Sequence, residues 1–142
     1  MIGFLFAVIA GAAMSIQGVM NTRLQEHIGL WEANAYTQGT AFALSLIVMW
    51  LFGSGHLGNL AQTPKGYLLS GVLGLVITVT VMLSIKGLSP TVAVSTILIA
   101  QLLVAAMIDG FGWMGQEKIS MNAKQFIGLA LMLGGVVLFK WK

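Results

Sequence analysis

The 142-residue chain is 58% hydrophobic and only 8% charged, whereas a soluble globular domain carries roughly 25% charged residues. Because so few charges can cover a water-exposed surface, the composition indicates an integral membrane protein. Its net charge of +3 results from seven Lys and Arg residues against four Asp and Glu residues, and the basic residues are scattered singly, so no basic patch for nucleic acid is predicted. The sequence contains no cysteine, which excludes disulfides and thiol chemistry within this chain.

Five apolar segments are long enough to cross a bilayer as helices. A transmembrane helix needs about 20 mostly apolar residues, and its backbone groups must form hydrogen bonds within their own segment. In chain order the predicted spans are residues 3–22, 33–53, 67–85, 91–109 and 125–140. The first lacks the basic start of a signal peptide and is too long for its apolar core, so we expect it to be retained. The sequence therefore predicts an all-α membrane protein with a single five-helix domain over residues 1–142.

Positive charge is divided almost evenly between the two sides of the membrane that these spans define. An odd number of spans places the two termini on opposite sides. One side carries three basic residues and the other four, namely Lys65, Lys118 and Lys124 against Arg23, Lys86, Lys140 and Lys142. Because an excess of Lys and Arg in short loops normally fixes orientation, a difference of one residue favours insertion both ways up. The alternative is that lipid composition or the first span imposes a single orientation.

Amide side chains lie on helical stripes in three of the predicted spans. Gln17 and Asn21 are four residues apart in the first span, and Gln38 lies on a polar stripe in the second. In the fourth span, Gln101 precedes Asp109 by eight residues. Polar groups inside a span usually face the bundle interior or water, so we predict that the four amides line a substrate cavity. The alternative is that these amides serve only as contacts between helices. Asp109 is either an ion-coupling group or a charge solvated at the membrane boundary.

Small residues recur at helical spacing in the first, third and fifth spans. The positions predicted to let helices approach closely are Gly11, Gly74, Gly128 and Gly135. Neither of the two histidines, His27 and His56, has the spacing of a metal ligand set. The sequence also shows no glycine-rich phosphate loop, nucleophile–base arrangement or carboxylate pair. We therefore predict no enzyme activity, no metal and no other cofactor.

Three blocks of sequence resemble the YdcZ family of the drug/metabolite transporter superfamily. They are residues 15–24 (SIQGVMNTRL), residues 101–113 (QLL leading to IDGFGW) and residues 125–136 (QFIGLALMLGGV). The last block is also similar to EamA-type transporters. The resemblance implies a half-sized transporter of the bacterial plasma (inner) membrane, equivalent to one half of an EamA-like inverted repeat. An antiparallel homodimer, or pairing with an oppositely oriented paralogue, would then complete a site near the membrane midplane.

The resemblance has one departure with a mechanistic consequence. Small multidrug exporters of the same superfamily use a membrane-embedded glutamate in their first helix, where this chain has Gln17 and Asn21. Proton-coupled export of cations by that mechanism is therefore not expected. We predict a small-molecule transporter that works by alternating access within the lipid bilayer, with its substrate unknown. The alternative is a non-transporting accessory subunit or a small pore.

Overall fold

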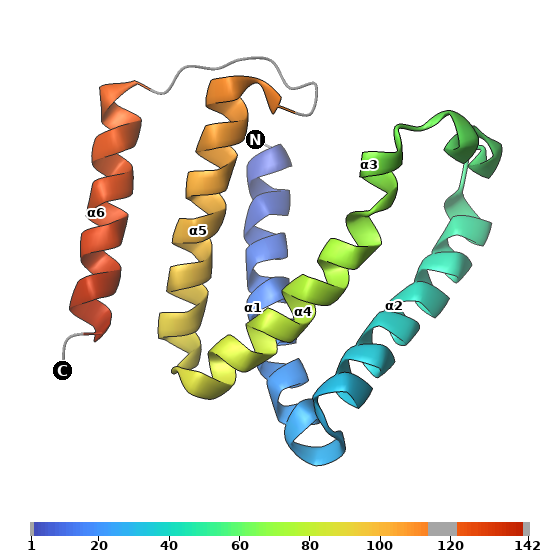
Figure 1. Ribbon diagram of the computed structural model, residues 1–142, viewed down its shortest axis with the longest axis horizontal. Coiled ribbons are helices and arrows are strands. Elements are labelled where there is room, and N and C mark those ends of the chain that lie inside the picture. Colours follow the sequence, from blue (N-terminus) through green and yellow to red (C-terminus); the bar gives the residue numbers. More distant parts are fainter. Residues whose placement is uncertain (1, 114–121, 141–142) are drawn as a thin grey trace. The chain divides into compact units, whose positions relative to one another are not determined.

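The computed structural model describes residues 2–113 and 122–140, and all of its regular elements are helical (Figure 1). In chain order they are α1 (Ile2–Ile28), α2 (Leu30–Phe52), the short 3₁₀ helix η1 (Leu57–Gln62), α3 (Lys65–Leu68), α4 (Ser70–Gly87), α5 (Pro90–Phe111) and α6 (Ala123–Lys140). No strand occurs in these described ranges. The all-α prediction is therefore confirmed.

Four helical segments are long and apolar enough to cross a membrane. They are α1, α2, the combined α3–α4 segment Lys65–Gly87, and α5. The apolar stretch of α6, Ala123–Leu138, is shorter, and at 1.5 Å per residue it covers about 24 Å of a hydrocarbon core that is about 30 Å thick. The structure thus supports a multi-pass membrane protein, and a fifth complete span stays a prediction. Lys118 and Lys142, two of the counted boundary charges, lie outside the described residues.

The first helix continues beyond its predicted end, and the predicted loop after it is almost absent. α1 reaches Ile28 and α2 begins at Leu30, so Gly29 alone separates them. Gly29 has φ 101°, a left-handed conformation that favours glycine, and its N–H donates to the Gln25 carbonyl at 3.0 Å. Hydropathy marks where a helix leaves hydrocarbon, and polar residues can extend a helix past that boundary. This is why residues 23–28 were wrongly predicted as loop.

Local sequence signals explain the other helix boundaries. The third predicted span is interrupted at Leu69, which separates α3 from α4. Ser89 is the N-cap of α5, and its hydroxyl accepts a hydrogen bond from the Val92 N–H at 3.4 Å. Pro90 occupies the first turn, where its fixed φ suits a helix start. At the other end of α5, Gly112 is left-handed at φ 66° and Phe111 stacks on Trp113 with ring centroids 5.3 Å apart.

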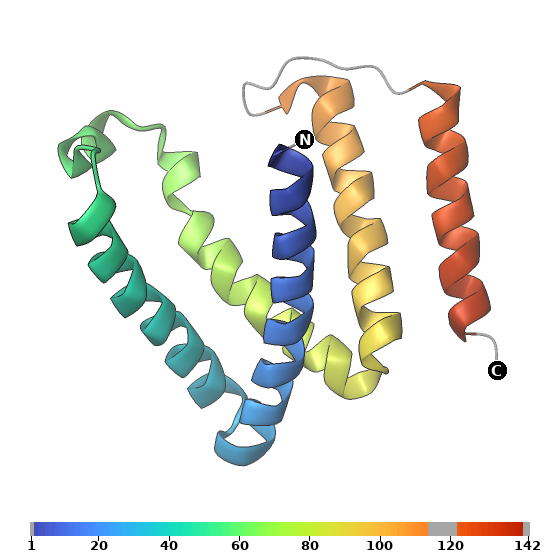
Figure 2. The same cartoon turned by 180° about the vertical axis from the view of Figure 1, so that it is seen from behind.

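The chain forms two compact units, Met1–Gly87 and Leu88–Lys142. In the first unit α1 packs against both α2 and α4, and α2 also contacts α4; in the second unit α5 packs against α6. Figures 1 and 2 show α1 and α2 meeting at their hairpin and diverging away from it. Residues 2–14 and 41–60 are accordingly exposed, and they include many large apolar side chains such as Phe4, Phe42 and Trp50. Such surfaces require lipid or another protein surface to cover them.

The first unit is tightest near the hairpin, where α1 crosses α4. A Cβ atom added at Gly18 would lie 2.9 Å from Ile85 Cδ1 and 3.1 Å from Val81 Cγ1, so the close approach depends on glycine. The predicted packing glycine Gly74 faces Gln38, whose Nε2 would lie 3.5 Å from an added Cβ. Among the described residues, nothing lies within 4 Å of a Cβ added at Gly11, Gly128 or Gly135. For these three positions close packing stays a prediction.

Candidate functional site

A band of polar side chains lies within the apolar helices of the first unit; Asn21 is buried, Thr37, Gln38 and Thr78 are half-buried, and Gln17 is exposed. We call it the amide layer, and its members are Gln17, Asn21, Thr37, Gln38 and Thr78. Gln17 precedes Arg23 in α1 by six residues, and Thr78 precedes Lys86 in α4 by eight. At 1.5 Å per residue these separations place Gln17 and Thr78 about 9–12 Å inside the charged boundary of the first unit, whereas Asn21, two residues before Arg23, lies only about 3 Å inside it. At the depth of Gln17 and Thr78 a polar group usually has a structural or functional reason to be present.

Two side-chain hydrogen bonds join the three helices through the amide layer. The Thr37 hydroxyl on α2 donates to Asn21 Oδ1 on α1 at 3.0 Å. Gln38 Nε2 on α2 donates to Thr78 Oγ1 on α4 at 3.4 Å. Asn21 and Thr37 face each other because each is eight residues from the hairpin glycine, Gly29. The hairpin therefore sets the register of the layer.

A second polar group lies closer to the hairpin end of the first unit. Gln25 Nε2 donates to the Met82 carbonyl at 3.3 Å, and the Thr22 hydroxyl donates to the Gly18 carbonyl at 2.7 Å. Asn34 is 5% exposed, and its Oδ1 has no hydrogen-bond partner among the described residues. An unsatisfied buried acceptor costs about 1–3 kcal/mol. These hydrogen bonds mainly stabilise the hairpin end of the first unit, and the Asn34 acceptor lowers that stability.

A small cavity adjoins the amide layer between α1 and α4. Its volume is about 50 Å³, and it is lined by Met14, Gln17, Gly18, Asn21, Ile77, Thr78 and Val81. This space is large enough for a few water molecules, whereas pockets for small molecules usually have about 300–1,000 Å³. Gln17 makes no hydrogen bond to any described residue, although it lies on the cavity wall. Within the first unit the cavity is therefore a partial site.

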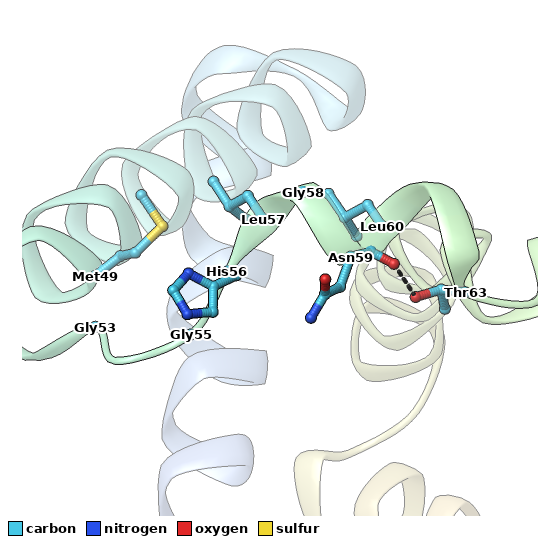
Figure 3. Close-up of a pocket in the computed structure, with 9 residues that line it drawn as sticks. All are labelled: Met49, Gly53, Gly55, His56, Leu57, Gly58, Asn59, Leu60 and Thr63. Atoms are coloured by element: carbon cyan, nitrogen blue, oxygen red, sulfur yellow. Dashed lines mark hydrogen bonds between the residues drawn. The ribbon is translucent and has the colours of Figure 1, made fainter.

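A larger hollow lies elsewhere, where the end of α2 meets η1 (Figure 3). It has a volume of about 770 Å³ and is lined by Met49, Gly53, Gly55, His56, Leu57, Gly58, Asn59, Leu60 and Thr63. All of these residues are exposed except Thr63, whose hydroxyl donates to the Asn59 carbonyl at 3.1 Å. Met49 is eleven residues beyond Gln38, about 16 Å along the helix. The hollow follows the shape of a surface loop and is separate from the amide layer.

The structure brings three of the four predicted cavity amides together. Gln17, Asn21 and Gln38 all belong to the amide layer of the first unit. Gln101 and the predicted ion-coupling residue Asp109 lie on α5 in the second unit, and both are exposed. Their roles stay predictions.

Sequence reasoning missed the two threonines that hold the amides in place. Neither Thr37 nor Thr78 was among the predicted cavity residues. The usable signal was the hairpin register, because Gly29 at the turn pairs Asn21 with Thr37. Predicting residues 23–32 as a loop concealed that register.

Comparison with family models matches residues 2–138 to the family described as "Putative inner membrane exporter, YdcZ". Comparisons with curated proteins and with solved structures find no match. The family match covers nearly the whole chain, including all three blocks on which the sequence resemblance rests. The membrane-spanning helices fit the membrane location in the family's description. The chain belongs to the YdcZ family.

Proposed function

We propose that this protein exports a small molecule across the bacterial inner membrane by alternating access, as an antiparallel homodimer. The family description supports export. The observation that carries the proposal is Gln17, an amide inside an apolar span that lines a cavity and bonds to no described residue. Contacts between helices would explain the bonded pairs Asn21–Thr37 and Gln38–Thr78. They do not explain an amide without a partner, which is costly in hydrocarbon unless water or substrate reaches it.

The depth of the amide layer supports a site shared by two inverted copies. In a hydrocarbon core about 30 Å thick, Gln17 and Thr78 lie about 9–12 Å from one boundary and therefore only about 3–6 Å from the midplane. A second copy inserted the other way up would bring its own Gln17 and Thr78 to the same distance on the opposite side of the midplane. Two layers would then meet around one central cavity, and two partial sites would form a complete one.

The near balance of basic residues and the exposed apolar surface are consistent with this assembly. A difference of one charge gives little preference for either orientation. Residues 2–14 and 41–60 offer apolar helix surface that the chain itself leaves exposed. Gln17, Asn21, Gln38 and Gln101 would bind substrate through hydrogen bonds, and Asp109 would couple transport to an ion. An oppositely oriented paralogue could replace the second copy.

Accessibility to water distinguishes a transport site from helix contacts. Because the chain contains no cysteine, a single Gln17→Cys substitution can be probed with a charged, membrane-impermeant thiol reagent in proteoliposomes. The matched control is Ile16→Cys, a neighbour at nearly the same depth that does not line the cavity and is 61% exposed on the helix surface. We expect rapid modification of Gln17→Cys and little of Ile16→Cys. Equal, negligible modification of both would favour the accessory-subunit interpretation.

Electrical recordings separate a carrier from a small pore. A carrier that alternates between two closed conformations passes no steady current in KCl across a planar bilayer. A pore gives a current proportional to voltage. We expect the first result, and an ohmic current that scales with the amount of reconstituted protein would support a pore instead.

A further inference from the structure

We infer that the short 3₁₀ helix η1 lies in the interface of the lipid bilayer, with the side chains of Leu57 and Leu60 inserted among the acyl chains. The proposed transport function gives this segment no role and is not needed for the inference. Two features of the molecule point to this position. They are the arrangement of side chains around η1 and the place of η1 just beyond the end of α2.

The length of α2 places η1 at a membrane boundary. Glu32 is the last acidic or basic residue before η1, and Phe52 ends α2 twenty residues later. Twenty helical residues cover about 30 Å, which matches the thickness of the hydrocarbon core. Trp50 and Phe52 are 83% and 79% exposed, so the apolar end of α2 is open to lipid. The chain therefore leaves the hydrocarbon core shortly before η1 begins at Leu57.

The segment that contains η1 has no charge that would hold it in water. Residues 53–64 include no Asp, Glu, Lys or Arg. Charged groups are the most costly to move from water toward an apolar environment, so their absence lowers the cost of approaching the bilayer. The next charged residue is Lys65, the first residue of α3. A basic group at this place is attracted to anionic lipid headgroups.

The side chains of η1 form three ridges of different chemistry. In a 3₁₀ helix, residues three positions apart lie one above the other. The first ridge is apolar, the second consists of small residues and the third carries amides; they are Leu57 and Leu60, Gly58 and Ala61, and Asn59 and Gln62. Figure 3 shows the two leucines on one side of η1 and Asn59 on the opposite side. The helix is therefore amphipathic.

Hydrogen bonds maintain this conformation. The Asn59 N–H donates to the His56 carbonyl at 3.1 Å, and the Thr63 N–H donates to the Leu60 carbonyl at 3.2 Å. The Thr63 hydroxyl also donates to the Asn59 carbonyl at 3.1 Å. Because unpaired backbone groups are costly near hydrocarbon, these bonds make it easier for the segment to approach the acyl chains.

The lipid bilayer is the partner that fits the leucine ridge. Leu57 and Leu60 are 65% and 50% exposed, and they line the same hollow as Met49 from α2. The ridge is therefore continuous with the apolar end of α2, which is open to lipid. In the interface the leucines would contact acyl chains, while the amide ridge would contact headgroups and water. Interfacial amphipathic helices divide their faces in the same way.

Spin labels around η1 test this position, because the chain contains no cysteine of its own. Single variants Leu57→Cys, Gly58→Cys, Asn59→Cys and Leu60→Cys would be labelled in vesicles of phosphatidylethanolamine and phosphatidylglycerol. Relaxation of each label by oxygen, which concentrates in lipid, is compared with relaxation by a water-soluble nickel chelate present on both sides of the membrane. We expect oxygen to dominate at positions 57 and 60, and the chelate to dominate at positions 58 and 59.

Other accessibility patterns contradict the inference. Dominance of the chelate at all four positions would place η1 in water, and dominance of oxygen at all four would place it inside the hydrocarbon core. Weak relaxation by both reagents at positions 57 and 60 would show that protein covers the leucine ridge. Each of these results would overturn the interfacial position.

Two double substitutions on the labelled Gly58→Cys variant provide a matched pair. Nothing described lies within 4 Å of a Cβ at position 58, so the label has room. Leu57→Ser with Leu60→Ser removes the apolar ridge and should increase relaxation of the label by the chelate, because η1 moves away from the bilayer. Asn59→Ser with Gln62→Ser alters only the amide ridge and should leave that relaxation unchanged. Equal relaxation in the two double variants would overturn the anchoring role of the leucines.

Discussion

Replacing Gly18 with valine should loosen the contact between α1 and α4 and lower the stability of the first unit. A Cβ at this position would lie 2.9 Å from Ile85 Cδ1 and 3.1 Å from Val81 Cγ1, closer than the separation of about 3.5–4.0 Å at which carbon atoms pack best. Overpacking of this kind typically costs about 1–3 kcal/mol. Valine adds two further methyl groups with restricted rotation about χ1, so it cannot turn both of them away. We expect Gly18→Val to lower the free energy of unfolding by about 2 kcal/mol.

Alanine at the same position provides an internal scale. The Ile85 Cδ1 atom is at the end of a flexible side chain and can rotate away from a single methyl group. The gain of about 0.5–1 kcal/mol from replacing glycine inside a helix offsets part of the remaining clash. The free energy of unfolding of Gly18→Ala should therefore remain within about 1 kcal/mol of that of the parent protein.

The matched control is Gly11→Val, seven residues earlier on the same helix, where no described atom lies within 4 Å of an added Cβ. Unfolding in mixed micelles with increasing SDS, followed by far-ultraviolet circular dichroism, measures all three variants. We expect a lower unfolding midpoint for Gly18→Val alone. Equal midpoints for Gly18→Val and Gly11→Val would refute the close approach of α1 and α4.

Asn34→Leu should leave the SDS unfolding midpoint unchanged or raise it, because it removes a buried acceptor that lacks a partner among the described residues. Burying such an acceptor costs about 1–3 kcal/mol. A clearly lower midpoint would show that the Asn34 oxygen forms a hydrogen bond. Glu26→Gln removes the exposed ion pair with Arg23, whose atoms are 3.1 Å apart, and should cost less than about 1 kcal/mol. A larger loss would contradict its assignment as a solvated boundary pair. Asp109→Asn should make transport independent of an imposed pH gradient, and a parent protein already indifferent to that gradient would rule out proton coupling through Asp109.

The sequence was sufficient to predict the helices because their signal is local. An apolar segment in hydrocarbon must form its backbone hydrogen bonds within itself. A helix can therefore be predicted from the segment alone, without information about neighbouring helices. The ends of helices were harder to predict, since polar residues such as Gln25 extend α1 beyond the hydrophobic run. The single-residue turn at Gly29 depends on one left-handed conformation, and many glycines in this chain could have supplied it.

The composition of the candidate site was partly predictable, and its pairing was not. Amides in apolar spans stand out in any single sequence, so Gln17, Asn21 and Gln38 were identifiable. Which hydroxyl each amide bonds depends on the register of the α1–α2 hairpin and on how closely α4 approaches. That approach is set by Gly18, which shares a helix face with Gly11 seven residues earlier, so spacing alone does not tell which of the two glycines meets α4. Helix contacts of this kind are not encoded by spacing within one helix.

The most direct test of the account is the orientation of the chain in the membrane. Gly58 lies in the loop before α4 and Gly87 lies at the end of α4, so they mark opposite sides, and neither has a described atom within 4 Å of an added Cβ. Single Gly58→Cys and Gly87→Cys variants should each be modified by an impermeant thiol reagent, added outside intact cells, in about half of the molecules. Full modification of one variant and none of the other would show a single orientation. That result would contradict the antiparallel homodimer and leave the partial site to be completed by an oppositely oriented partner.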